Sequence, residues 1–90
     1  MLDEATYKFY GANGRVIHFG KKSTELLSYL ILNKKRFVPQ EEIIEKLWFE
    51  EETTKSLCRL RESVWRINRK LKGEARIQIK KNVGYRIRSV

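Results

Sequence analysis

Residues 55–72 read KSLCRLRESVWRINRKLK, and apolar side chains recur in this stretch at alternating intervals of three and four residues. At 3.6 residues per helical turn, this spacing places the apolar positions within one sector about 60° wide. Glycine commonly ends a helix, and Gly73 follows the run. Thr53 or Thr54 can cap its start. The sequence therefore predicts an amphipathic helix over about residues 54–72, and the positions expected in the core are Leu57, Leu60, Val64, Ile67 and Leu71.

The face of this helix opposite the apolar stripe is rich in arginine. It carries Lys55, Cys58, Arg59, Glu62, Trp65, Arg66 and Arg69. Residues 55–90 contain twelve Lys/Arg against two Asp/Glu, a net charge of +10, whereas residues 1–54 contain eight against nine, a net charge of −1, and together these give the +9 of the chain. A surface with this charge is typical of a protein that meets a polyanion.

The composition excludes several classes of protein. Ninety residues with 41% hydrophobic side chains predict one folded domain over residues 1–90, which can be part of a longer protein. A single cysteine, Cys58, permits no internal disulfide, and a cytoplasmic protein is expected. No apolar stretch approaches the roughly 20 residues of a membrane span. No metal-ligand spacing, catalytic constellation or phosphate loop is present, so we expect neither an enzyme nor a bound cofactor.

Two short β-rich runs precede the first helical pattern. They span residues 7–10 and 16–19 and are joined through Asn13-Gly14, a pair that favours a tight hairpin turn because both residues tolerate positive φ. The residues before these runs are expected to form an exposed lead-in. The sequence thus predicts an N-terminal β-hairpin, and the residues before the first predicted helix leave room for two strands or three.

Two more helices are predicted between this hairpin and the arginine-rich helix. Apolar residues at three-to-four spacing predict a helix from Lys21 to about residue 33. Residues 36–38 are expected to be extended, because the last of them precedes a proline. Pro39 then opens a helix with an acidic first turn, which suits the positive end of the helix dipole. Its expected buried face is Ile43, Ile44, Leu47 and Trp48.

A second hairpin follows the arginine-rich helix. Residues 76–80 and 85–88 alternate apolar and basic side chains on either side of residues 81–84. The order of elements predicts an α+β fold, the winged helix-turn-helix, with an N-terminal β-hairpin, three helices and a C-terminal β-hairpin wing. In that fold the third helix enters the major groove of DNA and the wing lies along the phosphates.

These residues resemble a known family. The chain is similar to the DNA-binding domain of OmpR/PhoB-type response regulators, and more closely to the related module of SARP-type bacterial transcriptional activators. The resemblance extends from about residue 7 to residue 87, although family members usually begin with a four-stranded sheet. The stretches that carry it are PQEEIIEKLW (39–48), LRESVWRINRKL (60–71) and VGYRI (83–87).

The resemblance implies sequence-specific binding of double-stranded DNA in transcription regulation. The third helix, about residues 54–72, would lie in the major groove and the wing, about residues 76–88, on the backbone. Main contacts are expected from Arg59, Ser63, Arg66 and Arg69, with phosphate contacts from the wing. The full set of candidate DNA-binding residues is Lys55, Arg59, Glu62, Ser63, Trp65, Arg66, Arg69, Lys80, Lys81 and Asn82. The resemblance also implies a homodimer on direct repeats and contact with RNA polymerase through residues 49–53.

Several alternatives remain open at this level. Glu62 can accept a hydrogen bond from cytosine or pair with Arg66 four residues later. Trp65 can touch DNA or pack against a neighbouring loop. Asn68 stands where many family members have arginine, so it is expected to interrupt the basic surface. The alternative function is a protein-interaction or RNA-binding module whose basic face meets an acidic partner.

Overall fold

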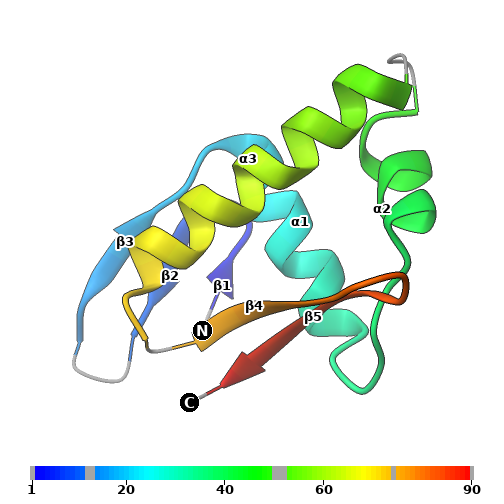
Figure 1. Ribbon diagram of the computed structural model, residues 1–90. Helices are drawn as coiled ribbons and strands as arrows, with labels where there is room; N and C mark the ends of the chain where they lie inside the picture. The colour runs from blue at the N-terminus through cyan, green and yellow to red at the C-terminus, as the bar shows by residue number, and fades with distance from the viewer. Residues whose placement is uncertain (1, 12–13, 50–52, 74, 90) are drawn as a thin grey trace.

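The computed structural model describes residues 2–11, 14–49, 53–73 and 75–89, and within these ranges it contains three helices and two antiparallel sheets. Figure 1 shows the three helices packed together, with the N-terminal sheet at the left and the C-terminal hairpin below them. The helices are α1 (Lys21–Leu32), α2 (Gln40–Leu47) and α3 (Thr53–Leu71). The strands are β1 (Leu2–Asp3), β2 (Lys8–Tyr10), β3 (Val16–His18), β4 (Ala75–Lys80) and β5 (Gly84–Ser89). The predicted winged-helix architecture is confirmed.

The N-terminal sheet has three strands, one more than the predicted hairpin and the larger of the two numbers that the sequence allows. Its order is β1-β2-β3, and Leu2 of β1 lies opposite Phe9 of β2, so the expected lead-in is wrong. A strand of two residues is too short to show alternation, which explains why the sequence does not predict it. Gly14 has the expected positive φ of 73° and donates its N–H to the carbonyl of Gly11 at 3.2 Å. The predicted turn residue Asn13 lies outside the described residues.

The hydrophobic core lies where the three helices meet the inner face of the β4-β5 hairpin. Its fully buried side chains include Leu26, Leu27, Leu30, Ile43, Leu60, Ile67, Leu71 and Ile77. Four of the five predicted stripe positions of α3 are buried, but Leu57 is only half-buried. Ser56 is fully buried beside it, because its hydroxyl donates a hydrogen bond to the carbonyl of Trp48 at 3.4 Å. Trp48 itself is buried at the end of α2, as expected.

The wing, which is the β4-β5 hairpin, is attached to the rest of the molecule at two points. Val38 pairs with Tyr85 of β5 through two backbone hydrogen bonds, of 2.7 and 2.9 Å. On the other strand, the side chain of Asn68 donates to the carbonyl of Ile77 at 3.1 Å and accepts from its N–H at 2.7 Å. Asn68 therefore holds β4 against α3, and the expectation that it interrupts the DNA-facing surface is wrong.

The turn between α1 and α2 is held by a polar cluster of three side chains. The guanidinium of Arg36 contacts both carboxylate oxygens of Glu42, at 3.2 and 2.6 Å, and the hydroxyl of Tyr29 donates to the same carboxylate. The hydrogen bond from Arg36, followed by that from Tyr29, lowers the pKa of Glu42 to about 2. This cluster fixes the start of α2, where Pro39 occupies the N-cap, one position before the first helical turn.

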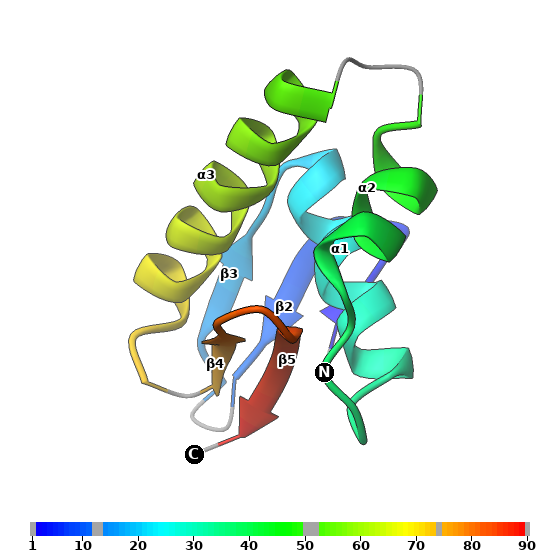
Figure 2. The same cartoon turned by 45° about the vertical axis from the view of Figure 1, so that its right-hand side comes forward.

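No helix within the described part of the chain is long and apolar enough to cross a membrane. Figure 2 shows the wing in front of the N-terminal sheet, both to the right of the lower end of α3, and α2 in front of α1. The wing sits at one flank of α3 and the N-terminal sheet at the other. Both flanks of this helix are occupied, and its outer side is free of other elements.

Candidate nucleic-acid interface

The outer side of α3 carries the predicted cationic surface. Nineteen residues at about 1.5 Å each make this helix roughly 28 Å long. Ser63 is half-buried, and the other predicted positions of α3, which are Lys55, Arg59, Glu62, Trp65, Arg66 and Arg69, are exposed. The helix therefore presents a long, cationic and solvent-accessible face.

The exposed acidic residue of this face is paired. Glu62 accepts a hydrogen bond from the guanidinium of Arg66 at 3.0 Å, and both side chains are about 60% exposed, at 59% and 62%. The pairing predicted from their i,i+4 spacing is confirmed. An exposed helical pair of this kind contributes only about 0.3–0.5 kcal/mol. It can open at little cost, so it leaves the guanidinium available to a nucleic acid.

Trp65 lies beside Arg69 instead of packing against a loop. The guanidinium carbon of Arg69 is 5.1 Å from the centroid of the indole ring, close enough for a cation–π contact. The indole is nevertheless 59% exposed. The two side chains thus form a flat, cationic platform on the outer side of α3.

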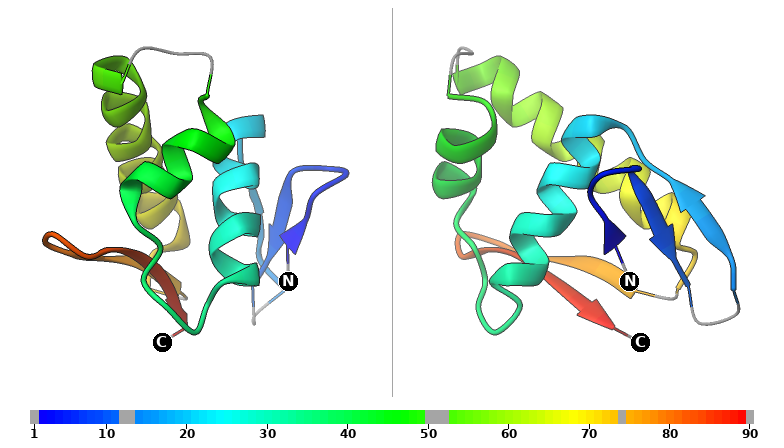
Figure 3. Two further views of the ribbon diagram at one scale, coloured as in Figure 1. Left: turned by 90° about the vertical axis from the view of Figure 1, so that its right-hand side faces the viewer. Right: turned by 180° about the vertical axis from the view of Figure 1, so that it is seen from behind.

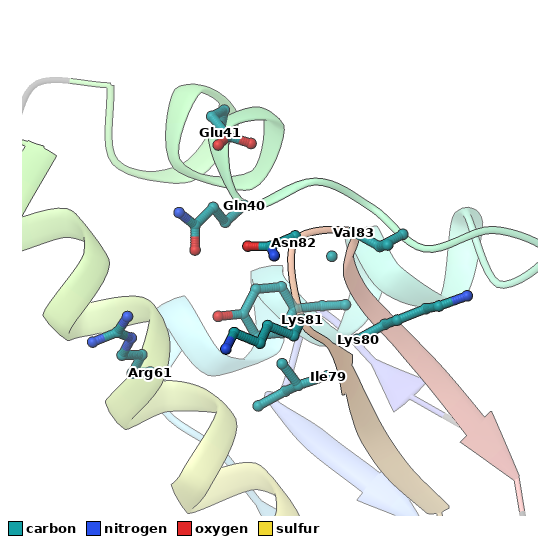
Figure 4. Close-up of a pocket in the computed structure, with 10 residues that line it drawn as sticks. Gln40, Glu41, Arg61, Ile79, Lys80, Lys81, Asn82 and Val83 are labelled. Carbon is teal, nitrogen blue, oxygen red and sulfur yellow. The ribbon is translucent and has the colours of Figure 1, made fainter.

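A cleft separates α3 from the tip of the wing. It has a volume of about 590 Å³ and lies between the start of α2, Arg61 of α3 and residues 79–85 of the wing. In Figure 4 the side chains of Arg61 and Lys81 point toward the same side, and the amide of Asn82 points toward Gln40. Asn82 has a positive φ of 63°, a conformation that asparagine tolerates better than most residues. The cleft therefore brings together two cations and two amides from three elements, with the carboxylate of Glu41 at its far rim.

Tyr85 closes the floor of this cleft. Burial raises the pKa of its phenol, whereas the nearby Arg61 acts in the opposite direction. The phenol is thus neutral near pH 7, so it carries no negative charge that would offset the positive charge of Arg61. The cleft can accept an anion for this reason.

Arg61 is the functional candidate that the sequence did not reveal. It lies seven residues before Asn68, on the same flank of α3, and Asn68 contacts β4. That flank faces the wing, but the hydrophobic stripe of a helix does not show on which side a later hairpin will pack. Only the tertiary structure therefore places Arg61 beside the cleft at the wing tip.

The two lysines predicted at the wing tip leave it on opposite sides. Figure 4 shows Lys81 directed into the cleft and Lys80 directed away from it. The ammonium of Lys80 is 5.6 Å from the centroid of the Phe37 ring. The tip thus carries one cation on each side.

The other flank of α3 is held by the N-terminal sheet. Lys70 donates to the carbonyl of His18 at 2.7 Å, and the guanidinium of Arg15 donates to the carbonyl of Lys70 at 2.5 Å. These cations are used in attaching β3 to the C-terminal end of α3. Among the described residues, no group of three or more His, Cys, Asp or Glu side chains is placed to hold a metal ion.

Comparison with known proteins gives a consistent result. Residues 14–87 match the family described as transcriptional regulatory protein, C terminal. The structure is similar to the crystal structure of the DNA-binding domain of Bacillus subtilis CssR, with a TM-score of 0.81 and 25% identity over 97% of each chain. It is also similar to the DNA-binding domain of E. coli CadC, with a TM-score of 0.72 and 13% identity over 97% of this chain and 83% of the other. A search of curated proteins finds no match.

Proposed function

Because the chain belongs to the family of transcriptional regulatory protein C-terminal domains, its function is sequence-specific DNA binding in a transcriptional regulator, and we propose that α3 reads the major groove while the wing holds the backbone. The OmpR/PhoB-type resemblance seen in the sequence is confirmed by this family match. The observation that carries the proposal is the outer side of α3, where exposed arginines form a face free of other elements. A helix of this size fits the major groove, which is about 12 Å wide.

We propose that side chains along α3 make polar contacts to bases or phosphates and apolar contacts to sugars or thymine methyl groups. Arg66 and Arg69 lie on successive turns of the outer side, and a guanidinium can bond both acceptors of a guanine edge or a phosphate. Trp65 extends the same surface for contact with sugars or thymine methyl groups. The remaining predicted contacts of this helix, Lys55, Arg59, Glu62 and Ser63, lie around them and stay part of the proposed site.

The wing is proposed to bind phosphates. Lys81 faces Arg61 across the cleft, so a phosphate placed there would meet a cation from each of two elements. Asn82 adds an amide donor at the tip, and Lys80 can reach the backbone on the opposite side. Phosphate contacts of this kind fix the register of a protein on the duplex and carry no sequence information.

A salt titration with variants tests this assignment. Arg66→Ala is expected to weaken binding to a selected promoter duplex by roughly 1 to 3 kcal/mol if it reads a base, with a smaller effect on scrambled duplex. Lys35→Ala removes the same charge from the turn between α1 and α2 and serves as the matched control. An equal loss on all sequences would assign Arg66 to phosphate. Failure of the protein to prefer any duplex in a promoter pool would contradict sequence-specific reading.

The subtype of the regulator and its arrangement on DNA are proposed as well. We propose a bacterial, cytoplasmic regulator of the SARP type that binds direct repeats as a homodimer. The sequence pattern described above supports the subtype, and the two similar structures come from bacteria. Two shifted complexes on a duplex with two repeats, and one on a duplex with a single repeat, are expected in a gel-shift titration.

Contact with RNA polymerase is proposed through the segment after α2. Phe49 is 72% exposed there, and an exposed aromatic side chain is a common anchor in protein interfaces. Residues 50–52 of this segment lie outside the described residues. Phe49→Ser is expected to leave DNA binding unchanged and to reduce transcription from a bound promoter. Unchanged transcription would contradict this contact.

A further inference from the structure

The wing has a second cationic face, on the side away from α3. In an antiparallel pair, alternate residues and their cross-strand partners share a face. Ala75, Ile77 and Tyr85 are buried on the inner face. The register then places five other side chains together on the opposite, outer hairpin face, and these are Arg76, Gln78, Lys80, Arg86 and Arg88. Lys80 lies at the tip of the wing, and the three arginines lie nearer its base.

The arginines of the outer hairpin face are placed so that they repel one another. Arg76 lies directly opposite Arg88, and like charges in such a cross-strand pair are destabilising. Arg86 lies two residues before Arg88 on the same strand, about 6.8 Å away along it. Within the described part of the chain, none of these three guanidinium groups forms an ion pair with a carboxylate. The face therefore carries charge that the fold does not neutralise.

Arg86 is held in place by neighbours that leave part of it unsatisfied. Its guanidinium carbon is 4.4 Å from the centroid of the Phe37 ring, and one terminal nitrogen donates to Gln78 at 3.3 Å. Its Nε is buried and makes no hydrogen bond to any residue that the structure describes. An aromatic ring and an amide thus position this arginine, which is not how a freely solvated side chain is held.

The outer hairpin face is directed away from the cleft that α3 forms with the wing tip. α3 packs against β4, and Asn68 holds the free backbone edge of β4 at Ile77. Figure 3 shows the wing projecting from the body as a thin sheet, so its two faces look in different directions. Arg76 and Arg88 lie at the base of the hairpin, four residues from the tip at Lys80 and Gly84. DNA held by α3 and the wing tip would leave these arginines free.

We propose that the outer hairpin face binds the phosphate backbone of a second nucleic-acid segment, so that one domain bridges two duplexes. Guanidinium groups bond phosphate in a bidentate manner. Interfaces with nucleic acid are much more positive than those between proteins, whose centres are depleted in charged residues. The face fits the first class, because three of its side chains are arginines, and the aromatic ring of Phe37 lies against one of them, Arg86. This surface is independent of the one assigned to sequence reading.

A capture assay tests the bridge with the chain as it exists. One short duplex is immobilised, the protein is added at low salt, and retention of a second, fluorescent duplex is measured. The hairpin variant is Arg76→Gln with Arg88→Gln. The matched control, Lys21→Gln with Lys35→Gln, removes the same charge from α1 and the turn after it. The groove variant is Arg66→Gln with Arg69→Gln. Far-UV circular dichroism checks that each variant is folded.

The protein and the control are expected to retain the second duplex. The hairpin variant should bind the immobilised duplex within about twofold of the unchanged protein, yet retain the second duplex on the order of tenfold less, with a salt slope for capture smaller by about 1.8. The groove variant should bind one duplex through the outer hairpin face and retain no second one.

Three results would overturn the proposal. One is failure of the unchanged protein to capture a second duplex. Another is full capture by the hairpin variant, which would assign bridging to protein pairing. The third is binding of poly-glutamate, but of no second duplex, at the outer hairpin face, which would indicate an acidic protein. In each case the protein can still bind a single duplex through α3. A result that excludes the bridge between two duplexes therefore does not exclude the proposed DNA-binding function.

Discussion

Replacement of Gly84 by alanine is expected to detach the wing from the rest of the protein. Gly84 has a φ of +153°, which side chains rarely permit. A Cβ at this position would lie 2.2 Å from the carbonyl oxygen and 2.6 Å from the carbonyl carbon of Val38, and 2.9 Å from the nitrogen of Pro39. All three are backbone atoms, so no change of rotamer can relieve the overlap. β5 must move away from Val38.

The energetic cost follows from what this movement breaks. Loss of the two hydrogen bonds between Val38 and Tyr85 costs about 1–3 kcal/mol together. An alanine held at a positive φ costs about another 1–3 kcal/mol. The expected loss is about 4 kcal/mol from a total stability of about 5–15 kcal/mol. At roughly 4–8 °C per kcal/mol for a domain of this size, Tm should fall by roughly 15–30 °C.

Urea and thermal unfolding followed by circular dichroism would measure this loss. Gly73→Ala is the matched control, because Gly73 also has a positive φ, +90°, but a Cβ there would meet no atom within 4 Å. It carries the backbone strain without the overlap and should cost about 1–2 kcal/mol. If Gly84→Ala loses no more stability than Gly73→Ala, the contact with Val38 does not hold the wing and the reasoning is refuted.

Three further outcomes are expected from other parts of the molecule. Asn68→Ala should cost about 1–3 kcal/mol in urea unfolding, because both hydrogen bonds to Ile77 are lost; no change would mean that α3 and β4 are held by apolar contacts alone. The pKa of Glu42 in the folded protein, about 2, lies below the ordinary value of 4.5 for this carboxyl group, so its contribution to stability is present above about pH 5 and lost as pH falls through about 2. Glu42→Gln should therefore reduce the fall in urea midpoint over this range, and an unaltered fall would show that the contact with Arg36 adds nothing. Arg61→Ala should reduce the salt slope of duplex binding by about 0.9 if one phosphate contact is lost, whereas an unchanged slope would remove Arg61 from the interface.

Much of the fold was predictable because α3 and the wing follow strong local rules. The three-and-four spacing of Leu60, Val64, Ile67 and Leu71 places these four side chains on one face of a helix, and all four are buried. The alternation in the wing likewise predicted β4 and β5 to within one residue at each end. Local rules were weaker at the N-terminus, where the two-residue strand β1 depends on pairing with β2.

The candidate site was predictable in part. Exposure of Arg66 and Arg69 follows from the position of the apolar stripe, and the pairing of Glu62 with Arg66 follows from helix geometry. The roles of Arg61 and Asn68 did not follow, because they depend on which flank of α3 the wing covers. The register within the wing determines that Arg76 and Arg88 are opposite each other, and this too needs the turn geometry.

By itself, then, the sequence determined most of the buried face of α3, which helix is cationic, and that a hairpin follows it, because period and charge are local properties of a chain. Only the tertiary structure decided where the wing packs, that Gly84 must approach the carbonyl of Val38, and that Arg61 and Lys81 share one cleft. The physical reason is that these contacts join residues distant in sequence. Their geometry is set by how the helices and the wing pack around the shared hydrophobic core.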